Sequence, residues 1–294
     1  MPASQTEALH EQAKGLDARP PIEIARLMID AQVNAVRAAH DPLPAMVSGA
    51  EAMATTIRSG GSLHYVAAGS SALMAASDAL ELGGTFSIPT AQIRIHMAGG
   101  FPVGSEMPGA TEDETDEATT AVSGVSARDT VIAVSASGST PYTLAAARSA
   151  RAQGATIVAI ANNPDSELLA IADHAICIAT SPEIVSGSTR LGAGTAQKVA
   201  LNVLSTLMAV QLGHVHDGMM VNMHADNTKL RARASAIVSE IAGVDTDAAM
   251  AALDATEGRV KSAVLVAKGG SADRAESLLK ETDDNLRAAL ARLA

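Results

Sequence analysis

Two short segments of the sequence combine glycine with several hydroxyl groups, and each follows an apolar run. The first is AAGSSA at 67–72 and the second is SASGST at 135–140. Glycine lets a ligand approach the backbone, and the first N–H groups of a helix carry partial positive charge. Hydroxyls add hydrogen-bond donors, so such loops can bind a phosphate without lysine. The alternative for either loop alone is simple helix capping. The candidate ligand-binding residues are Gly69, Ser70, Ser71, Ser135, Ser137, Gly138, Ser139 and Thr140.

A third segment, SPEIVSGSTRLGAGTAQKVALNVLST at 181–206, is richer still in hydroxyls and glycines. It enters a helix that we expect to begin near Ala193. The length and polarity of the segment favour a functional loop over a flexible connection between helices. Its candidate binding residues are Glu183, Ser186, Ser188 and Lys198.

Carboxylates near these loops are candidates for general acid and base chemistry. Glu81 ends a mostly apolar helix that starts at the first loop. The acidic run GATEDETDEATT at 109–120 is typical of a solvated helix start, where the helix dipole favours negative charge. The eight histidines form no H-x-x-x-H pair, so no metal site is predicted.

Five apolar runs predict strands at 63–68, 93–98, 130–136, 156–161 and 174–180. Helical patterns lie between them at roughly 70–82, 113–124, 141–153 and 165–172. Two further helices, near 21–40 and 44–59, precede the first strand, and a long one follows near 193–212. Apolar strands alternating with helices predict an α/β fold with a doubly wound parallel five-stranded sheet. The two Gly/Ser loops would then lie at the carboxyl edge of that sheet, where such folds bind ligands.

After about residue 215 the strand patterns stop, and the sequence predicts a small all-helical region. Asp245 or Thr246 can cap one of its helices and Ser271 another. The expected division is therefore N-terminal helices at 1–60, a ligand-binding domain at 61–215 and a helical region at 216–294.

The composition narrows the partners and the compartment. The formal net charge is −11, which argues against nonspecific binding to nucleic acid. One cysteine excludes an intrachain disulfide and fits a reducing compartment. No signal-peptide pattern and no apolar stretch of about 20 residues are seen, so we expect a soluble cytoplasmic protein without a membrane segment.

The paired Gly/Ser loops resemble a sugar isomerase (SIS) phosphosugar-binding domain. Over nearly its whole length the chain resembles a narrower family, the N-acetylmuramic acid 6-phosphate etherases. The segment EIVSGSTRLGAGTAQKVALNVLST at 183–206 is similar to the signature of that family. The segments VSASGSTPYTLAAARSARAQGATIVAIANNP and MMVNMHADNTKLRARA, the N-terminal LDARPPIEIARLMIDAQ and the helical tail also fit.

The resemblance implies a lyase that cleaves the D-lactyl ether of a phosphorylated amino sugar, by elimination and then addition of water. The products would be N-acetylglucosamine 6-phosphate and D-lactate, as in peptidoglycan recycling. By position, the proton-donor glutamate of the family matches Glu81 and its second catalytic glutamate matches Glu112. The resemblance also implies a homodimer, and the chemistry requires no cofactor.

The chain departs from the family at both Gly/Ser loops. The first loop usually reads Gly-Thr-Ser-Gly-Arg-Leu, and here Ala72 and Leu73 replace its second glycine and its arginine. Ser139 stands where the second loop usually has arginine. Arginine is the preferred bidentate partner of a carboxylate, so its loss bears on recognition of the lactyl group. Two alternatives therefore stay open: a sugar-phosphate isomerase, or a phosphosugar sensor without activity.

Overall fold

Five parallel strands form the sheet that the apolar runs predict. Their order is β2-β1-β3-β4-β5, and every neighbouring pair is parallel. All residues of β1 and β3 are buried, as expected for strands covered on both faces. The predicted α/β fold is confirmed. The strands are β1 (Leu63–Ala67), β2 (Ile93–Met97), β3 (Thr130–Ser135), β4 (Thr156–Ala161) and β5 (His174–Cys177).

The computed structural model describes residues 5–223, 225 and 228–293. By its internal contacts the chain divides into two units, the first comprising residues 1–80 and 90–207. The second comprises residues 81–89 and 208–294. The predicted division at residues 60 and 215 stays a prediction. Among the described helices, none combines the length and the apolar character needed to cross a membrane.

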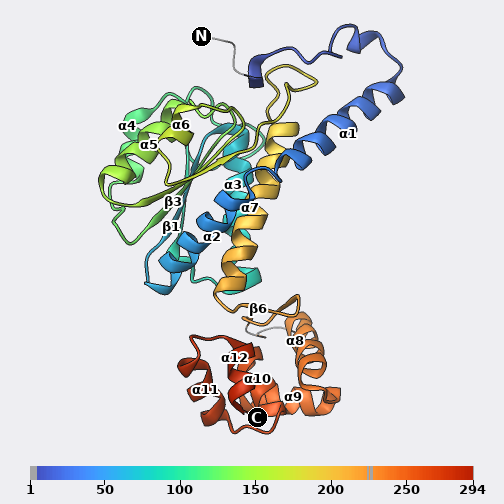
Figure 1. Cartoon of the computed structure of the whole chain (residues 1–294), viewed down its shortest axis with the longest axis vertical. Coiled ribbons are helices and arrows are strands. Elements are labelled where there is room, and N and C mark those ends of the chain that lie inside the picture. Colours follow the sequence, from blue (N-terminus) through green and yellow to red (C-terminus); the bar gives the residue numbers. More distant parts are fainter. Residues whose placement is uncertain (1–4, 224, 226–227, 294) are drawn as a thin grey trace. The chain divides into compact units, whose positions relative to one another are not determined.

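Helices cover both faces of the sheet in the first unit (Figure 1). On one face Ile157 and Ala159 of β4 pack in a cluster with Ala146 of α5 (Pro141–Ala152). On the other face, Val158 lies close to Gly49 of α2 (Leu43–Arg58), which also approaches Leu204 of α7 (Gly192–Gln211). The first face carries α4 (Thr115–Ala121), α5 (Pro141–Ala152) and α6 (Glu167–Ala170). The second carries α2 (Leu43–Arg58) with the first-unit parts of α3 (Gly69–Phe86) and α7 (Gly192–Gln211).

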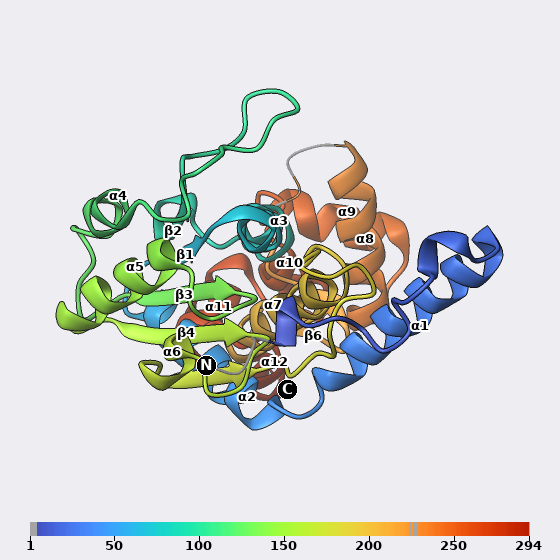
Figure 2. The ribbon, with the colours of Figure 1, turned by 90° about the horizontal axis from the view of Figure 1, so that it is seen from above.

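The N-terminal segment extends away from the sheet along α1 (Pro21–Ala38), and the chain returns to the sheet at α2. Helix α1 (Pro21–Ala38) extends away from the strands in both views of the chain (Figures 1 and 2). Ala35 is its buried residue, and apolar side chains on its length are exposed. Ahead of it lie the short 3-10 helices η1 (Gln5–Glu7) and η2 (Leu16–Ala18), and a third, η3 (Thr90–Gln92), precedes β2.

The second unit is mainly helical, as predicted, with its own apolar core. Asp245 caps α9 (Thr246–Ala255) by accepting the N–H of Ala248, and Ser271 caps α11 (Ala272–Glu281) by accepting that of Arg274. These contacts confirm the two predicted caps. One expectation was wrong, because two short antiparallel strands form after residue 214. The elements are β6 (Val215–His216), β7 (Met219–Met220), α8 (Thr228–Ala242), α9 (Thr246–Ala255), α10 (Val260–Ala267), α11 (Ala272–Glu281) and α12 (Leu286–Leu293).

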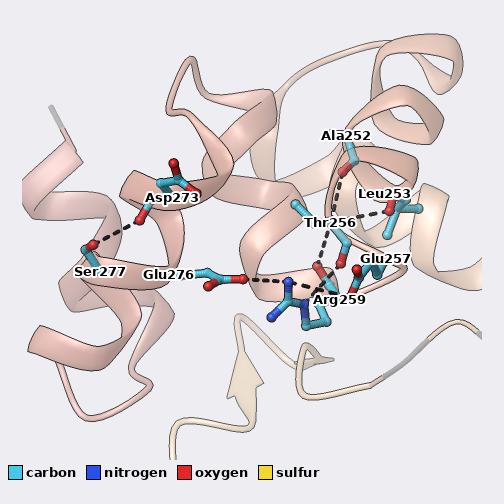
Figure 3. A network of polar contacts seen from close by, with 8 residues as sticks. All are labelled: Ala252, Leu253, Thr256, Glu257, Arg259, Asp273, Glu276 and Ser277. Carbon is cyan, nitrogen blue, oxygen red and sulfur yellow. Dashed lines mark hydrogen bonds and ion pairs between the residues drawn. The ribbon is translucent and has the colours of Figure 1, made fainter.

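Polar contacts join the helices around α10 in this unit (Figure 3). The buried Thr256 hydroxyl donates to the carbonyl of Ala252 at 2.9 Å and so closes the end of α9. Arg259, at the start of α10, pairs with Glu276 of α11 at 2.6 Å. About half of each of these two side chains is exposed, so their ion pair adds little stability beyond the apolar packing.

Candidate active site

The two Gly/Ser loops lie side by side because their strands are neighbours. Strand β1 pairs with β3 in a register that sets Ala67 opposite Val134, and each loop follows directly. The sheet order makes the gap between β1 and β3 the place where the chain reverses its direction of winding. Doubly wound sheets bind ligands at this switch point, so the tertiary structure supports the equivalence that the sequence suggested.

The hydroxyl groups of the second loop hydrogen-bond to one another. Ser135 Oγ lies 2.8 Å from Thr140 Oγ1 and 3.3 Å from Ser137 Oγ. It also accepts the N–H of Gly138 at 3.0 Å. Ser139 donates from both its backbone N–H and its hydroxyl to Ser137 Oγ. Hydroxyls can rotate, so this cluster can redirect its donors to a phosphate oxygen at the start of α5.

Gly138 is required at its position for two reasons. Its φ is 68°, in the left-handed region that favours glycine. A Cβ placed there would lie 2.4 Å from the Cβ of Ser166, which precedes α6. The carbonyl of Gly138 accepts the N–H of Leu168 at 3.0 Å, which holds the loop against α6.

Glu112 lies between the two loops. Its carbonyl accepts the N–H of Tyr142, in the first turn of α5, at 2.9 Å. Its carboxylate lies against the first loop, since a Cβ on Gly69 would be 2.7 Å from Glu112 Oε1. Gly69 also has a positive φ of 54° and begins α3. The structure therefore brings together one catalytic candidate and both predicted phosphate loops, with Ser70 and Ser71 in the first turn of α3.

Glu183 has a definite structural role at the start of α7. Its side chain is buried, and its two oxygens accept the N–H groups of Gly192 at 2.9 Å and Ala193 at 2.8 Å. The carboxylate thereby satisfies the free donors of a 20-residue helix and faces the positive end of its dipole. Ligand binding by Glu183 stays a prediction, and the capping contacts show how it shapes the 183–192 loop.

The remaining candidates are spread along the chain. Ser186 donates its hydroxyl to the carbonyl of Glu7 at 3.1 Å, and the half-buried Ser188 supports the same loop by accepting the N–H of Leu191. Lys198 is half-buried in the second turn of α7. Glu81 is exposed on α3, in the part of that helix that belongs to the second unit. The roles of these residues stay predictions.

Sequence reasoning missed two asparagines that follow β4. Asn163 donates from Nδ2 to the carbonyl of Ser137 in the second loop and to Thr6 Oγ1 in η1. Asn162 accepts from Gln197 Nε2 of α7 at 2.9 Å. Their signal in the sequence was the pair of amides directly after an apolar strand. These contacts fasten the N-terminal segment and α7 to the carboxyl edge of the sheet.

One further buried polar residue was missed, Asp78 in the middle of α3. Its carboxylate accepts hydrogen bonds from Tyr65 at 3.2 Å, Asn202 at 3.1 Å and Ser205 at 3.0 Å.

Among the described residues, no three His, Cys, Asp or Glu side chains group in a way that could hold a metal ion.

Comparison with known proteins places this chain in a family. The SIS domain family matches residues 105–212. An N-acetylmuramic acid 6-phosphate etherase of Deinococcus radiodurans is 42% identical over 268 residues, covering 90% of this chain and 88% of the relative. One of Streptomyces avermitilis is 42% identical over 291 residues, covering 97% of this chain and 93% of the relative. The chain belongs to the N-acetylmuramic acid 6-phosphate etherase family.

Etherase membership agrees with the resemblance carried by the 183–206 segment and by the paired loops. A solved phosphoheptose isomerase of Francisella tularensis is also similar, with a TM-score of 0.46 and 14% identity over 65% of this chain and 97% of that one. Relative to the usual etherase loops, the two replaced arginine positions are Leu73 and Ser139, and both side chains are exposed. Part of the etherase segment at 219–234, residues 224, 226 and 227, lies outside the described residues.

Proposed function

We propose that this chain is an N-acetylmuramic acid 6-phosphate etherase, a carbon–oxygen lyase that releases D-lactate and N-acetylglucosamine 6-phosphate. The observation that carries the proposal is the position of Glu112, whose carboxylate lies against Gly69 while its carbonyl holds the start of α5. A carboxylate is thus fixed between two loops suited to a phosphate. The family relationship supplies the substrate.

The elimination step needs two proton transfers. In the ring-opened sugar the aldehyde makes the proton on C2 acidic, and a carboxylate removes it. The electron pair of that C–H bond forms the C2–C3 double bond, the C3–O bond breaks, and the leaving oxygen of lactate takes a proton from an acid. Water then adds its oxygen to C3 and a proton to C2. Glu112 is the carboxylate that its contacts favour for one transfer, and Glu81 enters through the family resemblance.

The phosphate is proposed to bind at the two loops. Each loop ends at a helix start, where backbone N–H groups and the helix dipole attract an anion. The hydroxyls of Ser135, Ser137 and Thr140 add donors to the α5 end. Buried Gln197 Oε1 has no hydrogen-bond partner among the described residues, and it can accept from a sugar hydroxyl.

The proposal is tested by incubating the purified chain with N-acetylmuramic acid 6-phosphate and measuring D-lactate with a coupled dehydrogenase. In D₂O the elimination and hydration sequence places deuterium at C2 of the product. Glu112→Gln should lower kcat by at least about a hundredfold, the usual range for losing a general acid or base. Glu114→Gln, two residues away on the exposed start of α4, is the matched control and should keep wild-type activity. A folded wild-type chain that releases no lactate would refute the proposal.

We also propose that the enzyme is a cytoplasmic homodimer. Exposed apolar side chains follow one another along α1. Ile22 and Ile29 are each 61% exposed, Val33 is 42% exposed and Val36 is 36% exposed. Such a row favours burial against a partner, and a second copy of the chain offers the same row in return. Ile29→Asp should convert the dimer to a monomer in light scattering. The single cysteine, Cys177, supports a reducing compartment.

A further inference from the structure

Asp78 is a buried carboxylate held entirely by neutral donors. Its side chain is almost fully shielded from solvent in α3. The hydroxyl of Tyr65 donates to Oδ2 from β1, while Asn202 and Ser205 donate to Oδ1 from α7. A neutral side chain of the same size could join these elements without burying a charge. The burial of a charge at this position therefore indicates that the negative charge of Asp78 has a function.

A cationic residue lies on the same face of α7. Lys198, Asn202 and Ser205 are spaced i, i+4 and i+7, which aligns them along one side of the helix. Burial raises the pKa of Asp78 to about 6, and the hydrogen bonds and the positive charge of Lys198 act in the opposite direction. Tyr65 is the titratable group that contacts Asp78 from β1, and Lys198 is the charged group of α7 whose positive charge acts on it.

The turn that carries Lys198 lies at the carboxyl edge of the sheet. Its neighbour Gln197 bonds to Asn162, the residue that follows β4. One turn and a half earlier the helix begins at Gly192, where Glu183 caps it. Helical side chains lean toward the N-terminus of their helix, so Lys198 leans toward this same edge.

We propose that Asp78 is a positioning residue whose negative charge holds the Lys198 ammonium in place for the sugar phosphate. This inference rests on the proposed phosphosugar site and deepens it, because it assigns to that site a charged pair on α3 and α7. Lys198 supplies the cation that the two Gly/Ser loops themselves lack. Asp78 touches no reacting atom and acts through Lys198.

The test compares the binding of N-acetylglucosamine 6-phosphate, an unreactive probe, to wild type and Asp78→Asn by calorimetry. The amide oxygen of asparagine can still accept from Asn202 and Ser205, and its NH₂ can donate to the Tyr65 oxygen, so the contacts survive without the charge. At pH 7.5 we expect Asp78→Asn to weaken binding about fivefold to tenfold, the effect of losing one partly buried charge interaction. Ser205→Ala removes one hydrogen bond that lowers the pKa of Asp78 but leaves the carboxylate in place, so it should weaken binding less than Asp78→Asn does.

The pH dependence separates a positioning role from a structural one. Wild type should lose affinity relative to Asp78→Asn as the pH falls from 7.5 to 5.5, because protonation removes the charge only in wild type. The phosphate of the probe titrates in both proteins, so its effect cancels in the ratio of their dissociation constants. A ratio that is the same at both pH values would overturn the proposal.

A second variant makes the test independent of the first. Lys198→Met should weaken binding as Asp78→Asn does, and the double variant should be no weaker than Lys198→Met alone. Additive losses, or a wild-type chain that does not bind the probe, would overturn the role of the pair. If wild type binds the probe with the expected pH dependence but releases no lactate, the etherase proposal fails and the charged pair stands.

Discussion

The buried charge of Asp78 should cost the protein stability at neutral pH. Its pKa in the folded protein is about 6, above the ordinary value of 3.8, because burial disfavours the ionised form. Each pKa unit corresponds to 1.36 kcal/mol, so ionising Asp78 costs about 3 kcal/mol more in the folded chain than in the unfolded chain. A raised folded pKa means that the free energy of unfolding falls as the pH rises from about 4 to about 6 and is then constant.

Asp78→Asn removes this dependence because asparagine does not titrate. The free energy of unfolding of the variant relative to wild type should therefore increase by about 3 kcal/mol between pH 4 and pH 8. Urea unfolding followed by tyrosine fluorescence measures the free energy of unfolding of the first unit. Tyr65 and Tyr142 are the only tyrosines, the chain has no tryptophan, and both tyrosines lie in the first unit. Circular dichroism reports both units and shows whether they unfold together.

Asp129 provides a matched control of opposite sign. Burial raises its pKa, but hydrogen bonds from Ser62 and Ser126 more than offset this and leave the pKa below the ordinary value. Its charge therefore stabilises the fold fully above about pH 4, and this stabilisation is lost as the pH falls below about 4 through the folded pKa. Asp129→Asn should lose stability relative to wild type as the pH rises toward about 4 and should show no further change from about pH 4 to pH 8. If the relative stability of Asp78→Asn stays constant within about 1 kcal/mol from pH 4 to pH 8, the reasoning about the buried charge is refuted.

Three further variants probe the site. Gly69→Ala places a Cβ against the Glu112 carboxylate at a position with positive φ, so activity should fall about a hundredfold. Gly124→Ala, where a Cβ meets open space, is the control and should retain wild-type activity. Equal activities of the two variants would contradict the account of the first loop. Glu183→Gln leaves the start of α7 without its charge and should lower the free energy of unfolding by about 1–2 kcal/mol, seen as a lower urea midpoint. Asn163→Ala frees the second loop and η1 and should raise KM for lactate release; an unchanged KM would show that the loop is held without it.

Local patterns were sufficient to predict most of the fold. Apolar runs and the helical stretches between them gave the five strands and the parallel sheet, because strands buried on both faces leave no polar alternation. Capping chemistry predicted that helices start at Asp245 and Ser271, because a side-chain oxygen just before a helix accepts the free N–H groups of its first turn. The hairpin at 215–220 was missed because its two-residue strands are too short to show a pattern.

The site could be predicted only in part. The sequence placed the Gly/Ser loops at the ends of two strands, and their glycines and hydroxyls alone indicated an anion site. That Glu112 lies against Gly69 depends on the path of a connection more than 40 residues long, which no local pattern specifies. Asp78 looked like one polar residue in an alanine-rich helix, and its importance depends on three donors up to 127 residues away.

By itself, then, the sequence determined the strands, the helices, the loops with phosphate-binding character and the family, because each is encoded in residues close along the chain. Only the tertiary structure decided which loops are neighbours, which carboxylate lies between them, that Glu183 caps α7 and that Asp78 is buried. Burial and long-range hydrogen bonds arise when distant elements pack. They set the charge state and the position of a side chain, and these properties are not written in its immediate neighbours.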